Sequence, residues 1–326
     1  MPNRDQYVLI IGSSNMDLNI YSQRFPKPGE TVTGGIFKQF LGGKGANQAV
    51  ASVRSGSKTI FIGKVGVDAF GEEMLSQLRK EGVNIEHIIR DPHESSGVAF
   101  ILIDETGENM ISVAPGANFK LTPEEVQANS DFIKNAKCLV VQMEIPIETI
   151  EFIFKIAAQG EVIKILNPAP LKPIGLSILS NIDIIIPNEG ELLQLHSLLK
   201  LEELIGNNKE KIIQASKHIS RLGIKTIITT LGKKGCIIYD AEEDISTEVP
   251  AFKVEAIDTV GAGDCFNGVV ASKLCQGENI LTSVKYATAA ASIAITIQGA
   301  QASMPYLNEI EDRFKQYNAN YTVRTH

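Results

Sequence analysis

The chain has 326 residues, of which 44% are hydrophobic and 21% are charged; this composition is typical of globular proteins and excludes fibrous and disordered classes. Its 31 basic and 38 acidic residues give a net charge of −7, and such a surface disfavours broad binding to nucleic acids or acidic membranes. No apolar stretch approaches the roughly 18 residues that span a bilayer, and the first residues lack a secretory signal pattern, so we expect a cytoplasmic protein.

Apolar runs and helically spaced segments alternate along most of the chain. In chain order they predict a strand at 8–11, a helix at 47–54, a strand at 59–62, a helix at 70–80, a strand at 138–141, a helix at 147–158, strands at 162–166 and 182–186, a helix at 208–221 and a strand at 226–229. Continuous apolar strands that alternate with helices are typical of parallel sheets with both faces covered. The length allows two domains or one large unit, and the pattern predicts an α/β fold with a mainly parallel central sheet.

Two stretches do not follow this alternation of apolar strands and helices. Residues 16–20 alternate between apolar and polar side chains, and residues 98–103 and 110–113 flank a turn and predict a hairpin. Alternation indicates a sheet with one solvated face, so we expect residues 15–37 and 97–115 to form a small β-sheet. Such a sheet beside an α/β core is a candidate lid over a ligand site. The core would then comprise residues 1–14, 38–96 and 116–326.

Polar turn residues follow the predicted strands. Examples are residues 12–17, 167–170, 187–191 and 230–235, which are rich in Asn, Asp, Glu and Gly. In a parallel sheet all these turns emerge at the carboxyl edge, where open α/β sheets bind ligands. Strands end in polar turns in any case, but the bias towards Asn, Asp and Glu favours a binding site at this edge.

Residues 258–268 carry the clearest chemical signal. Gly261 and Gly263 permit close approach of the backbone at the start of a predicted helix, whose free N–H groups form an anion hole for a phosphate. Asp264 lies at the mouth of this hole. It could simply cap the helix, but the flanking glycines favour a second interpretation, in which Asp264 takes the proton of an attacking hydroxyl during phosphoryl transfer.

Residues 42–48 form a second glycine-rich turn into a helix. It is not a Walker A loop, because Gly45 follows Lys44 where that motif has Ser or Thr. Lys44 and Asn47 could hydrogen-bond a polyhydroxylated ligand, or the segment could be a plain helix start with a solvated lysine.

Eight blocks together resemble the ribokinase family of PfkB-type carbohydrate kinases along essentially the whole chain. In family order they are residues 12–17, 25–31, 42–48, 167–170, 187–191, 230–235, 258–268 and 299–301. The resemblance implies a ribokinase-like three-layer α/β sandwich with a mainly parallel central sheet and a small β-sheet lid. It also implies ATP-dependent phosphorylation of D-ribose to D-ribose 5-phosphate, with Asp264 as the catalytic base and residues 261–263 as the anion hole.

The resemblance implies site residues one by one. The sugar ligands would be Asn15, Asp17, Gly42, Gly43, Lys44, Asn47, Glu144 and Asp264. The nucleotide site would contain Asn188, Thr230, Leu231, Gly232, Lys233, Lys234, Gly235, Gly261, Ala262, Gly263 and Thr288. Thr288 stands where some ribokinases carry His beside the adenine.

Two cations are implied as well. Asn188 and Glu191 would act on Mg²⁺ indirectly, through water, which suits a hard cation that retains its hydration. A potassium ion would be held, mostly by carbonyl oxygens, at Asp258, Val260, Ala294, Ile297, Gly299 and Ser303. Ile297 replaces a commonly polar residue, which matters little where only its carbonyl is used.

The expected partners are the sugar and ATP, together with a second copy of the chain paired lid to lid, since exposed sheet edges invite pairing. Three alternatives stay open. Another pentose such as 2-deoxyribose, or another sugar or nucleoside, would use the same motifs, and a non-catalytic sugar-binding protein would keep Asn15, Asp17 and Lys44. A nicotinamide-dependent dehydrogenase shares the α/β pattern, but residues 12–17 lack the glycines of its fingerprint.

Overall fold

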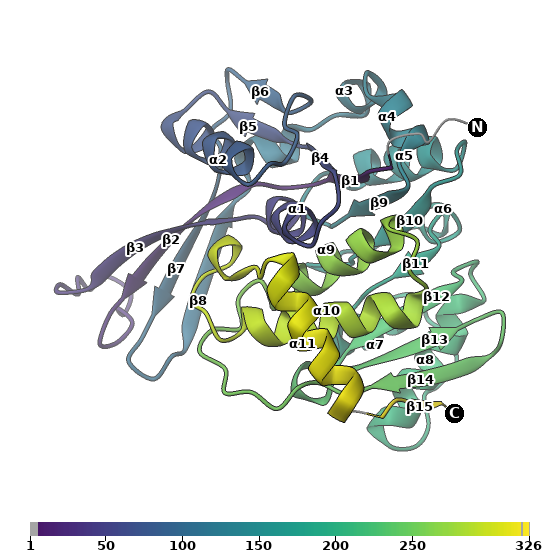
Figure 1. Ribbon diagram of the computed structural model, residues 1–326. Coiled ribbons are helices and arrows are strands. Elements are labelled where there is room, and N and C mark those ends of the chain that lie inside the picture. Colours follow the sequence, from purple (N-terminus) through teal and green to yellow (C-terminus); the bar gives the residue numbers. More distant parts are fainter. Residues whose placement is uncertain (1–5, 321, 326) are drawn as a thin grey trace.

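The computed structural model describes residues 6–320 and 322–325. Within them, nine strands form the central sheet in the order β15-β14-β13-β12-β11-β10-β9-β1-β4 (Figure 1). In sheet order these are Arg324–Thr325, Ile245–Val249, Cys236–Asp240, Thr226–Thr230, Ile184–Ile185, Ile163–Leu166, Cys138–Val141, Val8–Ile11 and Thr59–Ile62. The pairs from β4 to β12 are parallel, and β13, β14 and β15 continue the sheet antiparallel.

The predicted fold class is confirmed. All six strands expected from apolar runs lie in the parallel part of the sheet, and 8–11, 59–62 and 138–141 match their predicted bounds. Every residue of β1, β4 and β9 is buried. A continuous apolar run is therefore explained by burial on both faces rather than on one.

Two helical layers cover the sheet (Figure 1). Alternate residues of β1 enter different cores: Val8 and Ile10 join one, Leu9 and Ile11 the other. The first core is covered by α1 (Lys44–Arg54), α9 (Ala262–Cys275), α10 (Ile280–Ala294) and α11 (Leu307–Asn320). The second is covered by α3 (Pro123–Gln127), α4 (Ser130–Asn135), α5 (Ile147–Ala157), α6 (Leu176–Leu179), α7 (Glu189–Leu198) and α8 (Asn208–Ser220).

A small four-stranded sheet projects from the core (Figure 1). Its order is β3 (Ile36–Gly42), β2 (Asn15–Tyr21), β7 (Gly97–Ile103) and β8 (Asn109–Ala114), and β7 and β8 form the expected antiparallel hairpin. β3 pairs with β2 along its whole length, from Ile36 to Gly42. The small sheet thus extends five residues beyond the range 15–37 predicted for it, and its role as a lid stays a prediction.

A helix and two short strands support the base of the small sheet. Met16 on β2 packs with Met74 and Leu75 on α2 (Ala69–Lys80). Beside it, β5 (Lys64–Gly66) and β6 (Ile89–Asp91) form a parallel pair. Across residues 6–320 and 322–325, no helix is long and apolar enough to cross a membrane.

Candidate active site

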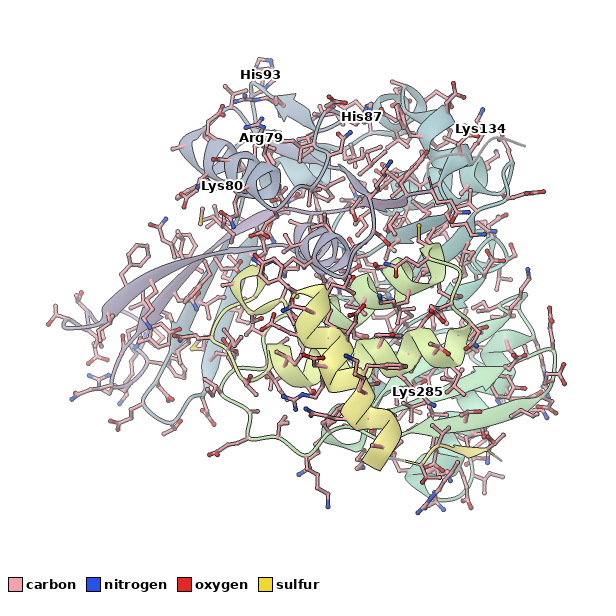
Figure 2. All side chains as sticks on the ribbon, viewed as in Figure 1. Arg79, Lys80, His87, His93, Lys134 and Lys285 are labelled. Carbon is pink, nitrogen blue, oxygen red and sulfur yellow. The ribbon has the colours of Figure 1, made fainter. Side chains whose placement is uncertain are left out.

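The residues predicted to bind a sugar meet in one cleft of about 580 Å³ between the small sheet and the carboxyl edge of the central sheet. The predicted ligands that line it are Asn15, Asp17, Gly43, Lys44, Asn47, Glu144 and Asp264. They come from β2, the start of α1, the turn after β9 and the first turn of α9. Within the described chain Lys44 is the one basic side chain in the lining, and the basic residues labelled in Figure 2 are not among the residues that line it.

Gly42 and Gly43 shape the cleft by leaving room. Gly42 does not line it, but a Cβ there would lie 2.2 Å from Oδ2 of Asp17. Gly43 has a φ of +85°, and its Cβ would lie 2.6 Å from the backbone of Ser14 and Asn15. Only glycine satisfies both the conformation and the approach at this position.

Asp264 is held by two side chains from α1. Asn47 Nδ2 donates to Oδ2 over 2.9 Å, and Gln48 Nε2 donates to Oδ1 over 3.0 Å. Gly261 occupies the N-cap of α9 in the left-handed conformation, with a φ of +75°, so Asp264 is not the cap residue. The helix-cap interpretation of Asp264 is therefore wrong, because its carboxylate turns towards α1 and the cleft.

Asp17, Glu144 and Asp264 lie close enough to Lys44 in this cleft to influence one another's charge. The pKa of Asp17 is raised to about 7, first by burial and then by the negative charges of Glu144 and Asp264, against the lowering effect of Lys44. The pKa of Lys44 is raised, most strongly by Asp264, which keeps its ammonium protonated. Glu144 accepts a bond from the Ser13 hydroxyl and another, over 3.0 Å, from the Lys44 backbone N–H. The site can bind a neutral, hydroxyl-rich molecule through several charged acceptors.

A second cavity, of about 530 Å³, begins on the other side of the α9 start. The predicted nucleotide residues that line it are Thr230, Gly232, Lys233, Gly235, Ala262, Gly263 and Thr288. The Thr288 hydroxyl is already engaged, donating to the Val284 carbonyl over 2.8 Å. The apolar walls of this cavity include Phe266, on α9 within residues 258–268, together with Phe252 and Val254. The sequence did not single out Phe252 and Val254, because apolar loop residues carry no motif.

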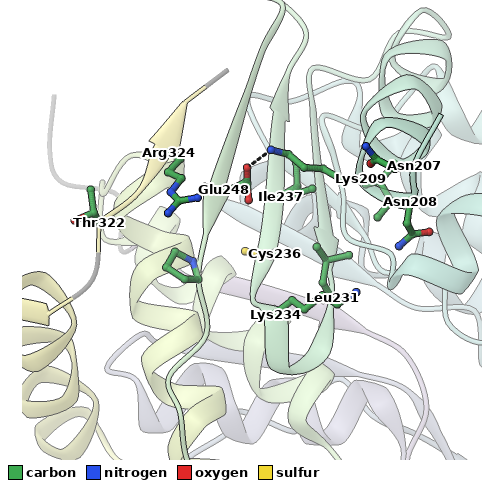
Figure 3. A pocket seen from close by; sticks show the side chains of 12 residues that line it. Asn207, Asn208, Lys209, Leu231, Lys234, Cys236, Ile237, Glu248, Thr322 and Arg324 are labelled. Atoms are coloured by element: carbon green, nitrogen blue, oxygen red, sulfur yellow. Dashed lines mark ion pairs between the residues drawn. The ribbon is translucent and has the colours of Figure 1, made fainter. Parts of the chain in front are cut away.

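Leu231 and Lys234 line a different cavity, of about 560 Å³, which Figure 3 shows from close by. There they lie near the start of α8, and the Lys209–Glu248 ion pair crosses the opening. The short helix η2 (Gly232–Lys234) and Gly235, with a φ of +99°, turn the chain between β12 and β13. Residues 230–235 therefore contribute to two cavities, and only part of the motif faces the one next to Asp264.

Asn188 and Glu191, predicted near magnesium, form a reciprocal cap at the start of α7. Asn188 Oδ1 accepts from the Glu191 backbone N–H and Glu191 Oε2 accepts from the Asn188 backbone N–H, both over 2.8 Å. Burial raises the pKa of Glu191, and the charges of Lys44 and Asp264 also act on it, so this carboxylate lies near the same centre. Within the described ranges no three His, Cys, Asp or Glu side chains gather as a metal-binding group. The pair fits a water-mediated contact better than a closed metal site.

Asp258 joins two loops at the end of the cleft. Its carboxylate accepts from the Val260 N–H over 3.0 Å and from the Gly299 N–H over 2.9 Å. Of the other residues predicted at a potassium site, Ala294 accepts from the Ile297 N–H over 3.1 Å at the end of α10. Ser303 is buried in the short helix η3 (Gln301–Ser303) and donates to the Ala300 carbonyl. Asp258, Val260 and Gly299 line the cleft together, whereas Ala294, Ile297 and Ser303 are absent from its described lining.

The chain is similar to known carbohydrate kinases. The model of the pfkB family of carbohydrate kinases matches residues 5–307. The ribokinase of Staphylococcus aureus is 39% identical over 305 residues, which cover 93% of this chain and 98% of that protein. The deoxyribokinase of Salmonella typhi is 33% identical, over 94% of this chain and 97% of its own.

A solved structure extends the comparison to three dimensions. The structure of Arabidopsis thaliana ribokinase complexed with ribose and ATP matches with a TM-score of 0.88 and 29% identity, covering 96% of this chain and 99% of that one. The family match spans nearly all of the described residues, including every element that builds the two cavities at Asp264. The chain therefore belongs to the pfkB family of carbohydrate kinases.

Proposed function

We propose that this chain transfers the γ-phosphoryl group of ATP to the primary hydroxyl of D-ribose, giving ADP and D-ribose 5-phosphate. The observation that carries the proposal is the junction of two cavities at one helix turn. Asp264 lines the hydroxyl-binding cleft, while Ala262 and Gly263, on the same turn, line the neighbouring cavity. The relatives named ribokinase, and the complex of one of them with ribose and ATP, support the choice of substrates.

Asp264 acts as the general base. It takes the proton of the sugar hydroxyl as the new O–P bond forms, and the bond from the γ-phosphorus to the ADP oxygen breaks. Early N–H groups of α9 have no acceptor within the helix, so those of Gly263 and Asp264 are suited to the negative charge of the transferring group. Asn47 Oδ1 is buried without a partner within the described chain and suits a sugar hydroxyl donor.

The residues at the phosphate end fit the cations that the resemblance implied. Mg²⁺, when bound with ATP, would neutralise phosphate charge. Glu191 and Asn188 would contact this ion through water, because Oε2 of Glu191 already accepts a hydrogen bond in the helix cap. A potassium ion would bind at the loop that the hydrogen bonds of Asp258 hold in place. It would stabilise the anion hole without taking part in the reaction. The nucleotide would be surrounded by Thr230, Gly232, Lys233, Gly235 and Thr288. It would not contact Leu231 and Lys234, which line the other cavity.

A second candidate substrate is 2-deoxyribose, favoured by the likeness to a deoxyribokinase. The two sugars differ by one hydroxyl, and Asp17 can accept donors from both hydroxyls of a diol. A charged acceptor left without its donor in a buried site costs about 1 to 3 kcal/mol, so ribose should be preferred at least several-fold.

A coupled assay of ADP release tests the proposal. D-Ribose, 2-deoxyribose, fructose, adenosine and pseudouridine are supplied with ATP and Mg²⁺, with and without potassium. We expect the highest kcat/KM with ribose and stimulation by potassium. A higher kcat/KM with any other sugar or nucleoside would contradict the substrate, and ribose binding without ADP release would select a non-catalytic sugar-binding protein.

The small sheet offers a surface for a second copy. Phe100 and Met110 on one face, and Ile111 and Val113 on the other, are more than half exposed. We expect the lid sheets of two copies to cover some of this apolar surface in a homodimer. Sedimentation equilibrium at micromolar concentration should give a dimer, which Met110→Asp, on the face away from the cleft, dissociates. A monomer in the wild type would contradict the pairing.

A further inference from the structure

A chain of buried amide groups ends on Asp264. Gln48 Nε2 donates to Asp264 Oδ1 over 3.0 Å and to Asn167 Oδ1 over 3.1 Å, and Gln142 Nε2 donates to Gln48 Oε1 over 2.7 Å. Gln48 and Gln142 are fully buried, and Gln48 is absent from the described lining of the cleft. The residues come from α1, the end of β9 and the end of β10, and no sequence motif connects them.

The direction of this chain is set by a backbone carbonyl. Asn167 Nδ2 donates to the Ile186 carbonyl over 2.9 Å, and a carbonyl can only accept. The Asn167 amide must therefore turn its oxygen towards Gln48, which obliges Gln48 to present its NH₂ group there. The same NH₂ group supplies the donor to Asp264.

A reversed Gln48 amide would lose its hydrogen bonds to Asn167 and Asp264. Its oxygen would face the accepting oxygens of both residues. Buried polar groups without partners are costly, so one orientation of Gln48 is strongly favoured. The Asp264 carboxylate consequently meets a fixed N–H donor on Oδ1, and only its remaining lone pairs face the cleft.

We propose that Gln48, held by Asn167 and Gln142, is a positioning residue that keeps the Asp264 carboxylate turned towards the substrate hydroxyl. The proposal rests on the role of Asp264 as the base. A carboxylate released from one of its two side-chain donors becomes free to rotate away from the reacting hydroxyl.

Gln48→Met tests the proposal, because it keeps the volume and removes the amide. We expect kcat to fall about 10- to 100-fold while the KM for ribose changes less than threefold. Ser52→Ala is the matched control: Ser52 is buried one turn further along α1 and bonds Thr59, and its loss should leave kcat within a factor of about two. An unchanged kcat in folded Gln48→Met, or an equal loss of kcat in Ser52→Ala, overturns the proposal.

A double-mutant cycle separates this proposal from the base assignment. In the Asp264→Asn background, Gln48→Met should cause less than a threefold further loss, because the group through which Gln48 acts is gone. If Gln48→Met lowered turnover by the same factor in the Asp264→Asn background as in the wild type, Gln48 would act independently of Asp264. That result would overturn its positioning role. Asp264→Asn that keeps more than about a tenth of the wild-type rate would instead overturn the base assignment itself.

Gln142→Met keeps the test decisive if Gln48→Met does not fold, as judged by circular dichroism. It removes only the bond to Gln48 Oε1 and leaves the donor to Asp264 in place but less constrained. We expect a smaller loss of kcat, about 3- to 10-fold, with the KM for ribose changed less than threefold. Folded Gln142→Met with wild-type kcat would overturn the oriented chain.

Discussion

Gly42 and Asp17 face each other so closely that a methyl group on residue 42 would lie 2.2 Å from the Asp17 carboxylate. The backbone of Gly42 is not in the left-handed region, so alanine is acceptable there apart from this contact. Gly42→Ala should push Asp17 aside and weaken ribose binding about 10- to 100-fold, as expected for loss of a charge-assisted hydrogen bond. Titration calorimetry checks the affinity. Gly175→Ala, at the start of α6 with a φ of −80°, is the control and should bind ribose normally.

Ribose binding should depend on pH near neutrality. The pKa of Asp17 is about 7 in the protein, and its ionised form accepts the sugar hydroxyls, so affinity should fall as the pH drops below about 7. Glu144→Gln removes a negative charge that raises this pKa and should therefore move the transition to lower pH, whatever it does to the affinity itself. Calorimetric titration without nucleotide between pH 5 and 9 measures both. A transition that moves to higher pH in Glu144→Gln would contradict the electrostatic account.

The cavity beside Thr288 should accept the nucleotide. Thr288→Leu adds volume to its wall and should raise the KM for ATP about tenfold while leaving the KM for ribose within a factor of two, since overpacking costs about 1 to 3 kcal/mol. Thr282→Leu lies on the same helix, outside the described lining, and serves as the control. Equal effects of the two variants on ATP would place the nucleotide elsewhere.

Potassium stimulation should depend on Asp258. Asp258→Asn can accept only one of the two N–H bonds from Val260 and Gly299, and the lost bond to a charged group is worth about 1.5 to 3 kcal/mol. We expect the loop to loosen and the stimulation of kcat by KCl over tetramethylammonium chloride to disappear. The ADP-release assay checks this at constant ionic strength, and stimulation of wild-type size in the variant would argue against a cation site at this loop.

The central strands were predictable because their signal is local. Residues 8–11, 59–62 and 138–141 are continuous apolar runs closed by polar turns, and their bounds match the structure. The run 182–186 yielded only Ile184–Ile185, since pairing with β10 and β12 is limited to these two residues. Residues 38–42 were assigned to the core because their pairing with β2 depends on a strand about twenty residues earlier, which the local pattern does not reveal.

The sequence predicted the residues at the carboxyl edge of the sheet that line the site, but not the buried hydrogen bonds behind them. Topology brings the polar turns of a parallel sheet together, and the glycine-rich turns lie where that rule places them. Gln48 stood within a recognised block, yet its contacts with Gln142 and Asn167 join residues about a hundred positions apart. Leu231 and Lys234 were grouped with their neighbours in sequence, but the turn at Gly235 directs them to another cavity.

The most direct measurement of the central claim compares wild-type protein with Asp264→Asn for ribose binding by calorimetry and for ribose 5-phosphate formation by the coupled assay. The account predicts that the variant binds ribose with nearly unchanged affinity and loses about 100-fold or more in turnover, because the hydroxyl proton has no acceptor. Turnover above about a tenth of the wild-type rate would contradict it.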